Sequence, residues 1–146
     1  MKPFVILNPA AGSVNDLEQL LKQIERLKPA AVRLTRKTGG AKACAAAALR
    51  QGCKYLIAAG GDGTLNEVIN GIAPHAARVR VGLLPLGTGN DFARCWNLPS
   101  DVEANIDILK AGKVRKVDLV RVRSDRTRYL VKFATRKRLT SPCRLR

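Results

Sequence analysis

A glycine-rich segment, Gly60-Gly61-Asp62-Gly63-Thr64, follows a short apolar run and has the composition of an anion-binding loop. Glycines have no Cβ, so the backbone can take unusual dihedral angles and bring its N–H groups close to an anion. A helix that starts at Thr64 would turn its positive N-terminal end toward the same anion. The residues therefore indicate a phosphate-binding loop. The alternative is a tight strand-to-helix turn in which the glycines serve only packing.

An acid in the middle of this segment, Asp62, is not explained by a packing turn. A carboxylate beside a bound phosphate repels it unless the carboxylate also holds a cation or accepts a hydrogen bond. Asp62 therefore predicts a role with Mg²⁺, or with a hydroxyl group of a ribose or a substrate.

Two further segments combine small residues with polar side chains at the ends of apolar runs. The segment Pro85-Leu86-Gly87-Thr88-Gly89-Asn90-Asp91 offers backbone N–H groups and a hydroxyl, although Asn90 or Asp91 could also serve only as the cap of a following helix. The segment Asn8-Pro9-Ala10-Ala11-Gly12 begins with an Asn-Pro turn. With the glycine segment, the sequence has three loops that could share one ligand.

The elements that would position these loops alternate along the chain. Apolar runs predict strands at 4–7, 31–35, 55–59 and 79–84. Helical spacing or helix-forming composition predicts helices at 17–27, 41–49, 64–72 and 101–111. This order predicts an α/β fold that is doubly wound, with a mostly parallel sheet and helices on both faces. In such folds ligands bind beyond the carboxyl ends of the strands, where all three loops are expected.

Two strings of residues resemble the catalytic domain of the diacylglycerol kinase family, which includes bacterial lipid kinases and sphingosine kinases. They are Gly60-Gly61-Asp62-Gly63-Thr64-Leu65-Asn66-Glu67-Val68 and Pro85-Leu86-Gly87-Thr88-Gly89-Asn90-Asp91-Phe92-Ala93-Arg94. Five specified residues recur by chance at about one in a million positions. Two such strings, each in a strand–loop–helix context, are therefore no coincidence. The resemblance extends over residues 3 to 122.

The resemblance implies Mg²⁺-dependent transfer of the γ-phosphoryl group of ATP to a lipid hydroxyl, with a diacylglycerol-like acceptor at the membrane surface. ATP and Mg²⁺ are thus the expected cofactors, and Asp91 matches an acid that organises Mg²⁺. Residues from all three loops, from the end of the second strand and from the helix behind the glycine segment are expected at the nucleotide. These candidates are Asn8, Thr35, Gly60, Gly61, Asp62, Gly63, Thr64, Glu67, Gly87, Thr88 and Asn90.

The sequence departs from the family pattern in two places. Family members often carry His-Ala or Asp-Ala after the position of Thr35, where this chain has Gly40-Ala41. Members also continue into a β-rich second domain that holds the lipid site, and we expect that domain to be missing here. The base that takes the proton of the lipid hydroxyl would come from that domain, or from Asp62 as the sphingosine kinase branch suggests. The resemblance thus makes Asp62 the candidate catalytic residue.

The charge is concentrated at the end of the chain. Residues 110–146 hold 14 basic and 2 acidic residues, a net charge of +12 out of +16 for the whole chain. We expect an ATP-binding domain over 1–122 and a basic tail over 123–146, the start of a truncated or altered second domain. Strands are predicted at 116–122 and 129–133. A segment that binds anionic lipid and, less favoured, a nucleic-acid tail are the alternatives for the basic tail.

The composition disfavours membrane-spanning, secreted, zinc-binding and RNA-binding proteins. No apolar run approaches the ~18–20 residues of a membrane span and no signal peptide is present, so we expect a cytoplasmic protein, peripheral at the inner membrane face. The four cysteines form no C-x-x-C pair and there is one histidine, which disfavours a zinc site and favours free thiols. Aromatic residues make up 4% of the chain, too few for a typical RNA-binding module.

Other functions fit parts of the pattern. A truncated remnant that binds ATP without turnover would share every loop with an active kinase. NAD kinase and phosphofructokinase share a Gly-Gly-Asp-Gly loop, but not the string from Gly87 to Arg94. A dinucleotide-binding domain is disfavoured because no G-x-G-x-x-G motif opens the first helix. The sequence predicts no oligomeric state.

Overall fold

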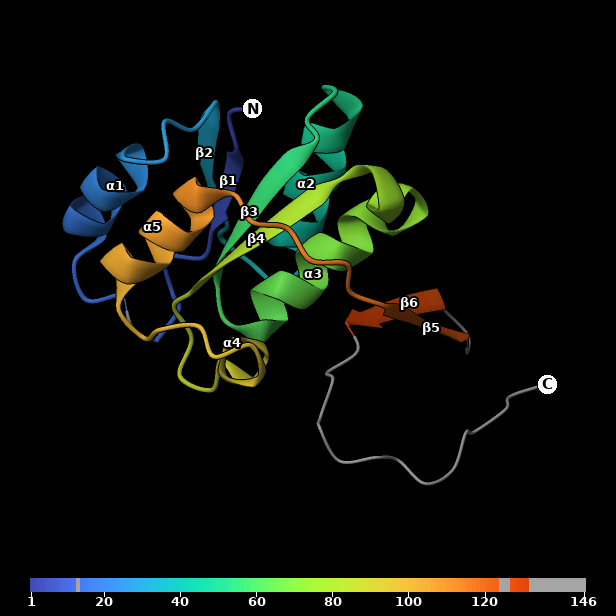
Figure 1. Ribbon diagram of the computed structural model, residues 1–146. Helices are drawn as coiled ribbons and strands as arrows, with labels where there is room; N and C mark the ends of the chain where they lie inside the picture. Colours follow the sequence, from blue (N-terminus) through green and yellow to red (C-terminus); the bar gives the residue numbers. More distant parts are fainter. Residues whose placement is uncertain (13, 124–126, 132–146) are drawn as a thin grey trace.

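The computed structural model describes residues 1–12, 14–123 and 127–131. Four parallel strands form its central sheet: β1 (Phe4–Leu7), β2 (Ala31–Leu34), β3 (Tyr55–Gly60) and β4 (Arg80–Pro85). They lie in the order β2-β1-β3-β4, with helices on both faces (Figure 1). The doubly wound α/β fold expected from the alternating pattern is confirmed.

The sheet reverses its direction of growth at β1. Phe4 pairs with Ala31 of β2 on one side and with Leu56 of β3 on the other. The chain therefore winds to one side of β1 first and then returns to add β3 and β4 on the other. Such a reversal opens a crevice beyond the carboxyl ends of the two diverging strands, which is where doubly wound folds bind their ligands. In this protein those strands are β1 and β3.

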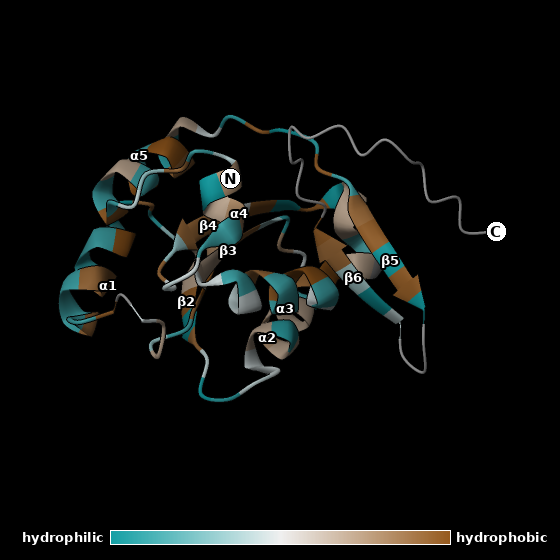
Figure 2. Cartoon of the chain, turned by 90° about the horizontal axis from the view of Figure 1, so that it is seen from below, coloured by the Kyte–Doolittle hydropathy of each residue, from teal (hydrophilic) through white to brown (hydrophobic). Residues whose placement is uncertain are grey.

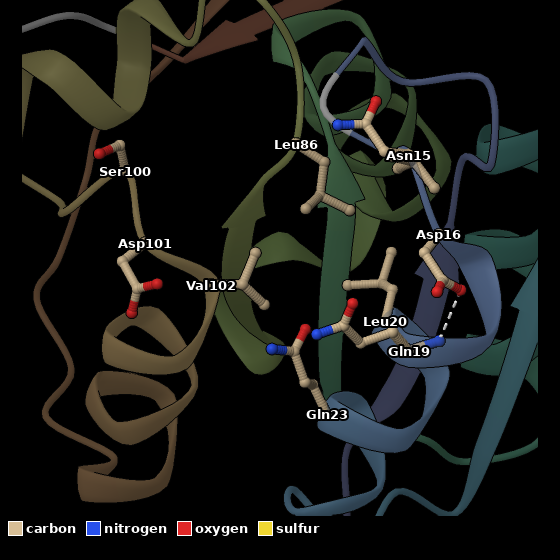
Figure 3. A pocket seen from close by; sticks show the side chains of 10 residues that line it. Asn15, Asp16, Gln19, Leu20, Gln23, Leu86, Ser100, Asp101 and Val102 are labelled. Atoms are coloured by element: carbon tan, nitrogen blue, oxygen red, sulfur yellow. Dashed lines mark hydrogen bonds between the residues drawn. The ribbon is translucent and has the colours of Figure 1, made fainter.

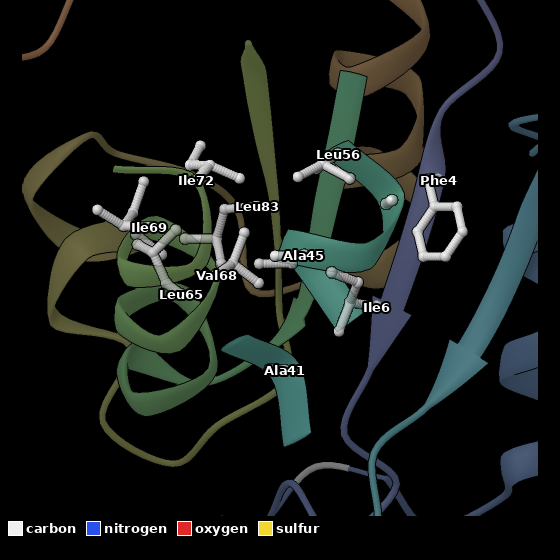
Figure 4. Close-up of a cluster of buried hydrophobic side chains, with 13 residues drawn as sticks. Phe4, Ile6, Ala41, Ala45, Leu56, Leu65, Val68, Ile69, Ile72 and Leu83 are labelled. Atoms are coloured by element: carbon white, nitrogen blue, oxygen red, sulfur yellow. The ribbon is translucent and has the colours of Figure 1, made fainter. Parts of the chain in front are cut away.

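Two apolar layers hold the helices against the sheet, because successive side chains of a strand point to opposite faces. Ile6 and Leu56 face α2 (Gly40–Arg50) and α3 (Asp62–Ile72), as Figure 4 shows. Val5 and Ile57 face α1 (Leu17–Glu25) and α5 (Val102–Ala111). All four strand side chains are fully buried, as expected for central strands of a parallel sheet that is covered on both faces.

Tyr55 links the start of β3 to the end of α5. Its hydroxyl donates a hydrogen bond to the carbonyl oxygen of Leu109 at 3.4 Å. Burial raises the pKa of the Tyr55 phenol, with an opposing effect from the nearby charge of Arg80. The phenol therefore stays protonated and keeps its role as a donor to α5.

Local signals set most of the helix ends. Asp16 caps α1 by accepting a hydrogen bond from the N–H of Gln19 at 2.9 Å, and Asp101 caps α5 in the same way. Gly112 ends α5 in the left-handed conformation. Most predicted boundaries are within one or two residues of the observed ones, and the start of α3 has a clear physical reason for its shift. Helix α3 begins at Asp62 rather than Thr64, because Gly61 already holds the extended conformation of an N-cap residue.

Helices α2 and α3 approach closely because small residues meet at their contact. A Cβ on Gly71 would lie 2.5 Å from the carbonyl oxygen of Lys42 and 2.8 Å from the Cβ of Ala45. No larger side chain fits between the two backbones at this level. The position of α3 along α2 is therefore fixed by direct backbone contact.

A two-stranded antiparallel hairpin follows α5. Its strands are β5 (Leu119–Arg123) and β6 (Thr127–Val131), where strands were predicted at 116–122 and 129–133. The segment 113–118 runs without regular structure, and positions 132 and 133 lie outside the described residues. Side chains of both strands pack against the core cluster. Figure 2 shows the hairpin beside α3.

Asn70 on α3 fastens this hairpin. Its side chain donates to the carbonyl oxygen of Tyr129 at 2.8 Å and accepts from the N–H of Tyr129 at 2.9 Å. The amide group thus bonds to β6 as a neighbouring strand would, and it satisfies one donor and one acceptor on the free edge of β6.

Asn70→Ala should release the hairpin and leave the sheet folded. Losing both bonds to Tyr129 should lower the free energy of unfolding by about 2 kcal/mol, at about 1 kcal/mol per bond. Amide hydrogen exchange measured by NMR should become faster at Tyr129 and stay slow at Ile57. Asn15→Ala, an exposed asparagine near α1, is the matched control. Unchanged exchange at Tyr129 would contradict the role given to Asn70.

The structure leaves some expectations untested. The basic tail lies mostly outside the described residues, and the predicted domain boundary after residue 122 falls within the hairpin and stays a prediction. In the described part of the chain, no helix is long and apolar enough to cross a membrane. Within the same part, no three His, Cys, Asp or Glu side chains gather as a metal site, and Cys44, Cys53 and Cys95 are free thiols.

Candidate functional site

The three predicted loops meet at the carboxyl ends of β1, β3 and β4. A Cβ on Gly87 would lie 2.6 Å from the Cα of Gly61, so the backbones of the second and third loops touch. A Cβ on Gly12 would lie 2.6 Å from the Cγ2 of Thr88, which brings the first loop against the third. At Gly87 only a hydrogen atom fits in place of a side chain, and at Gly61 an added Cβ would lie 3.2 Å from the Cα of Gly87, a tight contact.

Asp62 joins the second loop to α4 (Asp91–Cys95), the helix that follows the third loop. Its Oδ2 accepts a hydrogen bond from the N–H of Asp91 at 2.8 Å, and its Oδ1 accepts one from the N–H of Phe92 at 3.0 Å. The carboxylate therefore caps a helix that lies 29 residues away along the chain. Asn90 stands at the N-cap position of α4, as the local alternative expected, but its side chain makes no bond to the helix.

Asn90 instead closes the third loop on itself. Its φ is 50°, a left-handed conformation that asparagine tolerates better than most residues. Its side chain accepts a hydrogen bond from the N–H of Gly87 at 3.0 Å and donates one to the carbonyl oxygen of Gly87. Asp91 next to it is exposed and forms an ion pair with Arg94. The third loop thus holds its shape through its own side chains.

In the first two loops, too, some residues hold the shape of the loop and others are exposed to solvent. Asn8 accepts a hydrogen bond from the N–H of Ala10 at 3.1 Å, which stabilises the Asn-Pro turn. Thr64 is buried under the glycine loop, and a Cβ on Gly60 would lie 2.3 Å from its hydroxyl oxygen. Gly63 is exposed at the start of α3.

Thr35 lies at the turn between β2 and α2, and Glu67 reaches the same turn from α3. Thr35 is buried, and its N–H donates to the carbonyl oxygen of Leu7 at 2.8 Å. Glu67 accepts hydrogen bonds from the N–H groups of Gly39 and Ala41, at 2.8 and 3.0 Å. Both oxygens of its carboxylate are therefore bonded to the N-terminus of α2.

The structure brings most of the predicted site residues to one edge of the sheet. Thr35 belongs to the adjoining β2–α2 turn, and Glu67 on α3 bonds to that turn through its side chain. The residues on the three loops are Asn8, Gly60, Gly61, Asp62, Gly63, Thr64, Gly87, Thr88, Asn90 and Asp91.

A pocket beside the first and third loops was not indicated by the sequence. It has a volume of about 350 Å³ and lies between α1 and α5 (Figure 3). Its polar side chains come from α1 and from the residues just before α1 and α5, two segments far apart in the chain, so no sequence spacing links the two groups. A smaller hollow of about 190 Å³ adjoins the third loop and includes Arg94. The lining of the larger pocket includes Gln19, Gln23, Leu86, Ser100, Asp101 and Val102.

Comparison with known families settles which of the related folds this is. The profile of the diacylglycerol kinase catalytic domain matches residues 2–122, which contain the whole parallel sheet and all three loops. The chain belongs to the diacylglycerol kinase catalytic domain family. The resemblance carried by the two glycine-containing strings is thereby confirmed.

Curated diacylglycerol kinases resemble this family member over 140 residues. The diacylglycerol kinase of Staphylococcus saprophyticus is 40% identical, with 93% of this chain and 45% of the relative matched. The diacylglycerol kinase of Staphylococcus carnosus is 37% identical, again with 93% of this chain and 45% of the relative matched. A solved diacylglycerol kinase from Bacillus anthracis has a TM-score of 0.71 at 28% identity, covering 81% of this chain and 44% of the other. The chain spans about half the length of the curated relatives it matches.

Proposed function

We propose that this chain forms the ATP-binding part of a lipid kinase, which transfers the γ-phosphoryl group of ATP to the hydroxyl of a diacylglycerol-like lipid. One observation carries the proposal. Two glycine loops touch at Gly61 and Gly87, and Asp62 ties them together through the N–H groups of Asp91 and Phe92. Family membership supports the same activity.

The start of α3 is suited to the phosphates of ATP. The backbone bond that closes the first turn of α3 runs from the N–H of Leu65 to the carbonyl oxygen of Gly61 at 3.1 Å. The N–H groups of the preceding helical residues, Asp62, Gly63 and Thr64, therefore have no partner within the helix. They point out of the N-terminus of a helix of 11 residues, where the helix dipole favours an anion.

Two carboxylates at the loops, those of Asp62 and Asp91, are suited to binding Mg²⁺. This ion usually keeps several waters and binds through one or two carboxylates together with the phosphates of the substrate, where it neutralises their charge. Asp91 is exposed at the third loop, and Asp62 retains unused lone pairs because an ionised carboxylate accepts about four hydrogen bonds. Asp62 would thus hold α4 and also bind a metal-bound water or the hydroxyl of the acceptor, and we keep it as the candidate catalytic residue.

The lipid acceptor requires access to a membrane surface. The described residues 110–123 and 127–131 carry seven basic side chains and one acidic one. Each basic residue near an anionic membrane contributes about 1 kcal/mol to binding. Peripheral attachment at the inner membrane face is therefore part of the proposal, and this stretch would face the anionic lipid.

Calorimetric titration of the folded chain with Mg²⁺–ATP tests the nucleotide site. We expect binding with a dissociation constant between about 1 μM and 1 mM. The same sample is then given labelled ATP with vesicles that contain diacylglycerol, and in parallel with NAD. Transfer to the lipid would establish a lipid kinase, and transfer to NAD would favour the rival enzyme class. Binding without transfer would identify a nucleotide-binding part only, and a folded sample that fails to bind would refute the proposal.

A further inference from the structure

Glu67 lies on α3, but its carboxylate accepts hydrogen bonds from the backbone at the start of α2. Oε1 accepts a hydrogen bond from the N–H of Gly39 at 2.8 Å, and Oε2 accepts one from the N–H of Ala41 at 3.0 Å. Hydrogen bonds of a charged acceptor to backbone N–H groups are among the stronger ones in proteins. The two bonds hold the backbone on either side of Gly40.

Helix α2 depends on such an outside partner. Its N-cap residue, Gly39, has no side chain and a φ of 82°, and its first turn contains no acidic residue. The charge of Glu67 therefore supplies both the missing cap and the favourable interaction with the helix dipole. One turn farther along α3, the contact of Gly71 with the backbone of α2 keeps the two helices at a fixed spacing.

The anchored backbone lies directly against Thr35. A Cβ on Gly40 would be 3.4 Å from the Cβ of Thr35, so Gly40 covers that side chain. Thr35 is in turn bonded through its N–H to the carbonyl oxygen of Leu7, one residue before the first loop. A continuous path of contacts therefore runs from Glu67 through the start of α2 to Thr35.

We propose that Glu67 is a positioning residue, which fixes the β2–α2 turn (residues 35–39) beside the glycine loops. In this role Glu67 does not touch the nucleotide. It sets the place of the Thr35 side chain and of the two exposed cations of the same turn, Arg36 and Lys37, next to ATP. The inference rests on the proposed function, because ATP is the ligand for which the turn is positioned.

A double-mutant cycle with Thr35 separates this role from direct contact with ATP. We expect Glu67→Ala and Glu67→Gln each to weaken Mg²⁺–ATP binding about tenfold, because the amide of Gln keeps one acceptor oxygen but turns an NH₂ donor toward the other N–H group. If Glu67 acts through the turn, its loss should matter little once Thr35→Ala has removed the positioned side chain. The two losses then fail to add, whereas residues that contact the ligand independently give additive losses. Glu18→Ala, which removes an exposed acid on α1, is the matched control and should add nothing.

Amide hydrogen exchange gives a second readout that needs no ligand. In Glu67→Ala the N–H groups of Gly39 and Ala41 should exchange faster, while the strand amide of Ile57 keeps its protection. Additive losses in the cycle, or unchanged ATP affinity in Glu67→Ala, would overturn the inference. If the wild-type chain binds no ATP, the proposed function fails by itself, and unchanged exchange at Gly39 and Ala41 would then overturn the positioning role too.

Discussion

Asp62→Asn is expected to loosen α4 from the glycine loop and to weaken Mg²⁺–ATP binding about thirtyfold. A carboxamide has one acceptor oxygen, so one of the two N–H groups of Asp91 and Phe92 would face an NH₂ donor instead. An unsatisfied donor of this kind costs about 2 kcal/mol, which corresponds to about thirtyfold in an equilibrium constant. The substitution also removes a negative charge from the N-terminus of α4.

The single tryptophan of the chain makes this change observable. Trp96 stacks on Phe92, with ring centroids 5.9 Å apart, and Phe92 carries one of the N–H groups that Asp62 holds. The fluorescence of Trp96 should therefore shift in Asp62→Asn before any ligand is added. Asp107→Asn, an exposed acid on α5, is the control with the same chemical change. Wild-type fluorescence together with wild-type ATP affinity would refute the role assigned to Asp62.

Gly87→Ala is expected to reduce Mg²⁺–ATP affinity by at least about a hundredfold and to destabilise the fold by about 3 kcal/mol, the upper range for an overpacked site. The new Cβ would lie 2.6 Å from the Cα of Gly61 and 2.9 Å from the Oδ1 of Asn90. Carbon atoms in contact lie about 3.5–4.0 Å apart, so the two loops must separate. The same substitution in the other loop, Gly61→Ala, would place its Cβ 3.2 Å from the Cα of Gly87. It should therefore reduce stability and ATP affinity less than Gly87→Ala does.

Gly89→Ala is the matched control for this prediction. A Cβ there meets only Asp62 Oδ2, at 3.7 Å, which is an ordinary contact. Thermal unfolding and calorimetry of the three variants should rank Gly87→Ala as the most damaged, then Gly61→Ala, with the unfolding of Gly89→Ala close to wild type. Equal stability of Gly87→Ala and Gly89→Ala would show that the two loops do not need their close contact.

The strands, the parallel sheet and the meeting of the loops could be predicted because each depends on a local signal. Apolar runs mark β1 to β4, Asp16 and Asp101 stand where N-caps are expected, and Gly112 ends α5. The carboxyl ends of parallel strands share one edge, so the loops had to come together there.

The hydrogen-bond partners of the polar side chains could not be predicted in the same way. Asp62 caps a helix 29 residues away, and Glu67 bonds to Gly39, 28 residues before it. Asn70 reaches Tyr129 across 59 residues. No spacing rule covers such distances, because they depend on how the helices pack over the sheet. A local rule favoured Asn90 or Asp91 as the cap of α4, and Asn90 occupies the N-cap position without a side-chain bond to the helix. The family pattern predicts Glu67 at the nucleotide, whereas we propose that Glu67 positions the β2–α2 turn.

The central place of β1 has a consequence for the order in which the chain can fold. Residues 4–7 come before both of their partner segments in the chain, residues 31–34 and residues 56–59. Parallel pairing over such separations has a high contact order, which slows folding because long loops must close before any pairing is gained. The first and second loops become neighbours only when β1 and β3 pair. ATP binding would therefore arise late in folding, and its recovery during refolding should lag behind the formation of the helices.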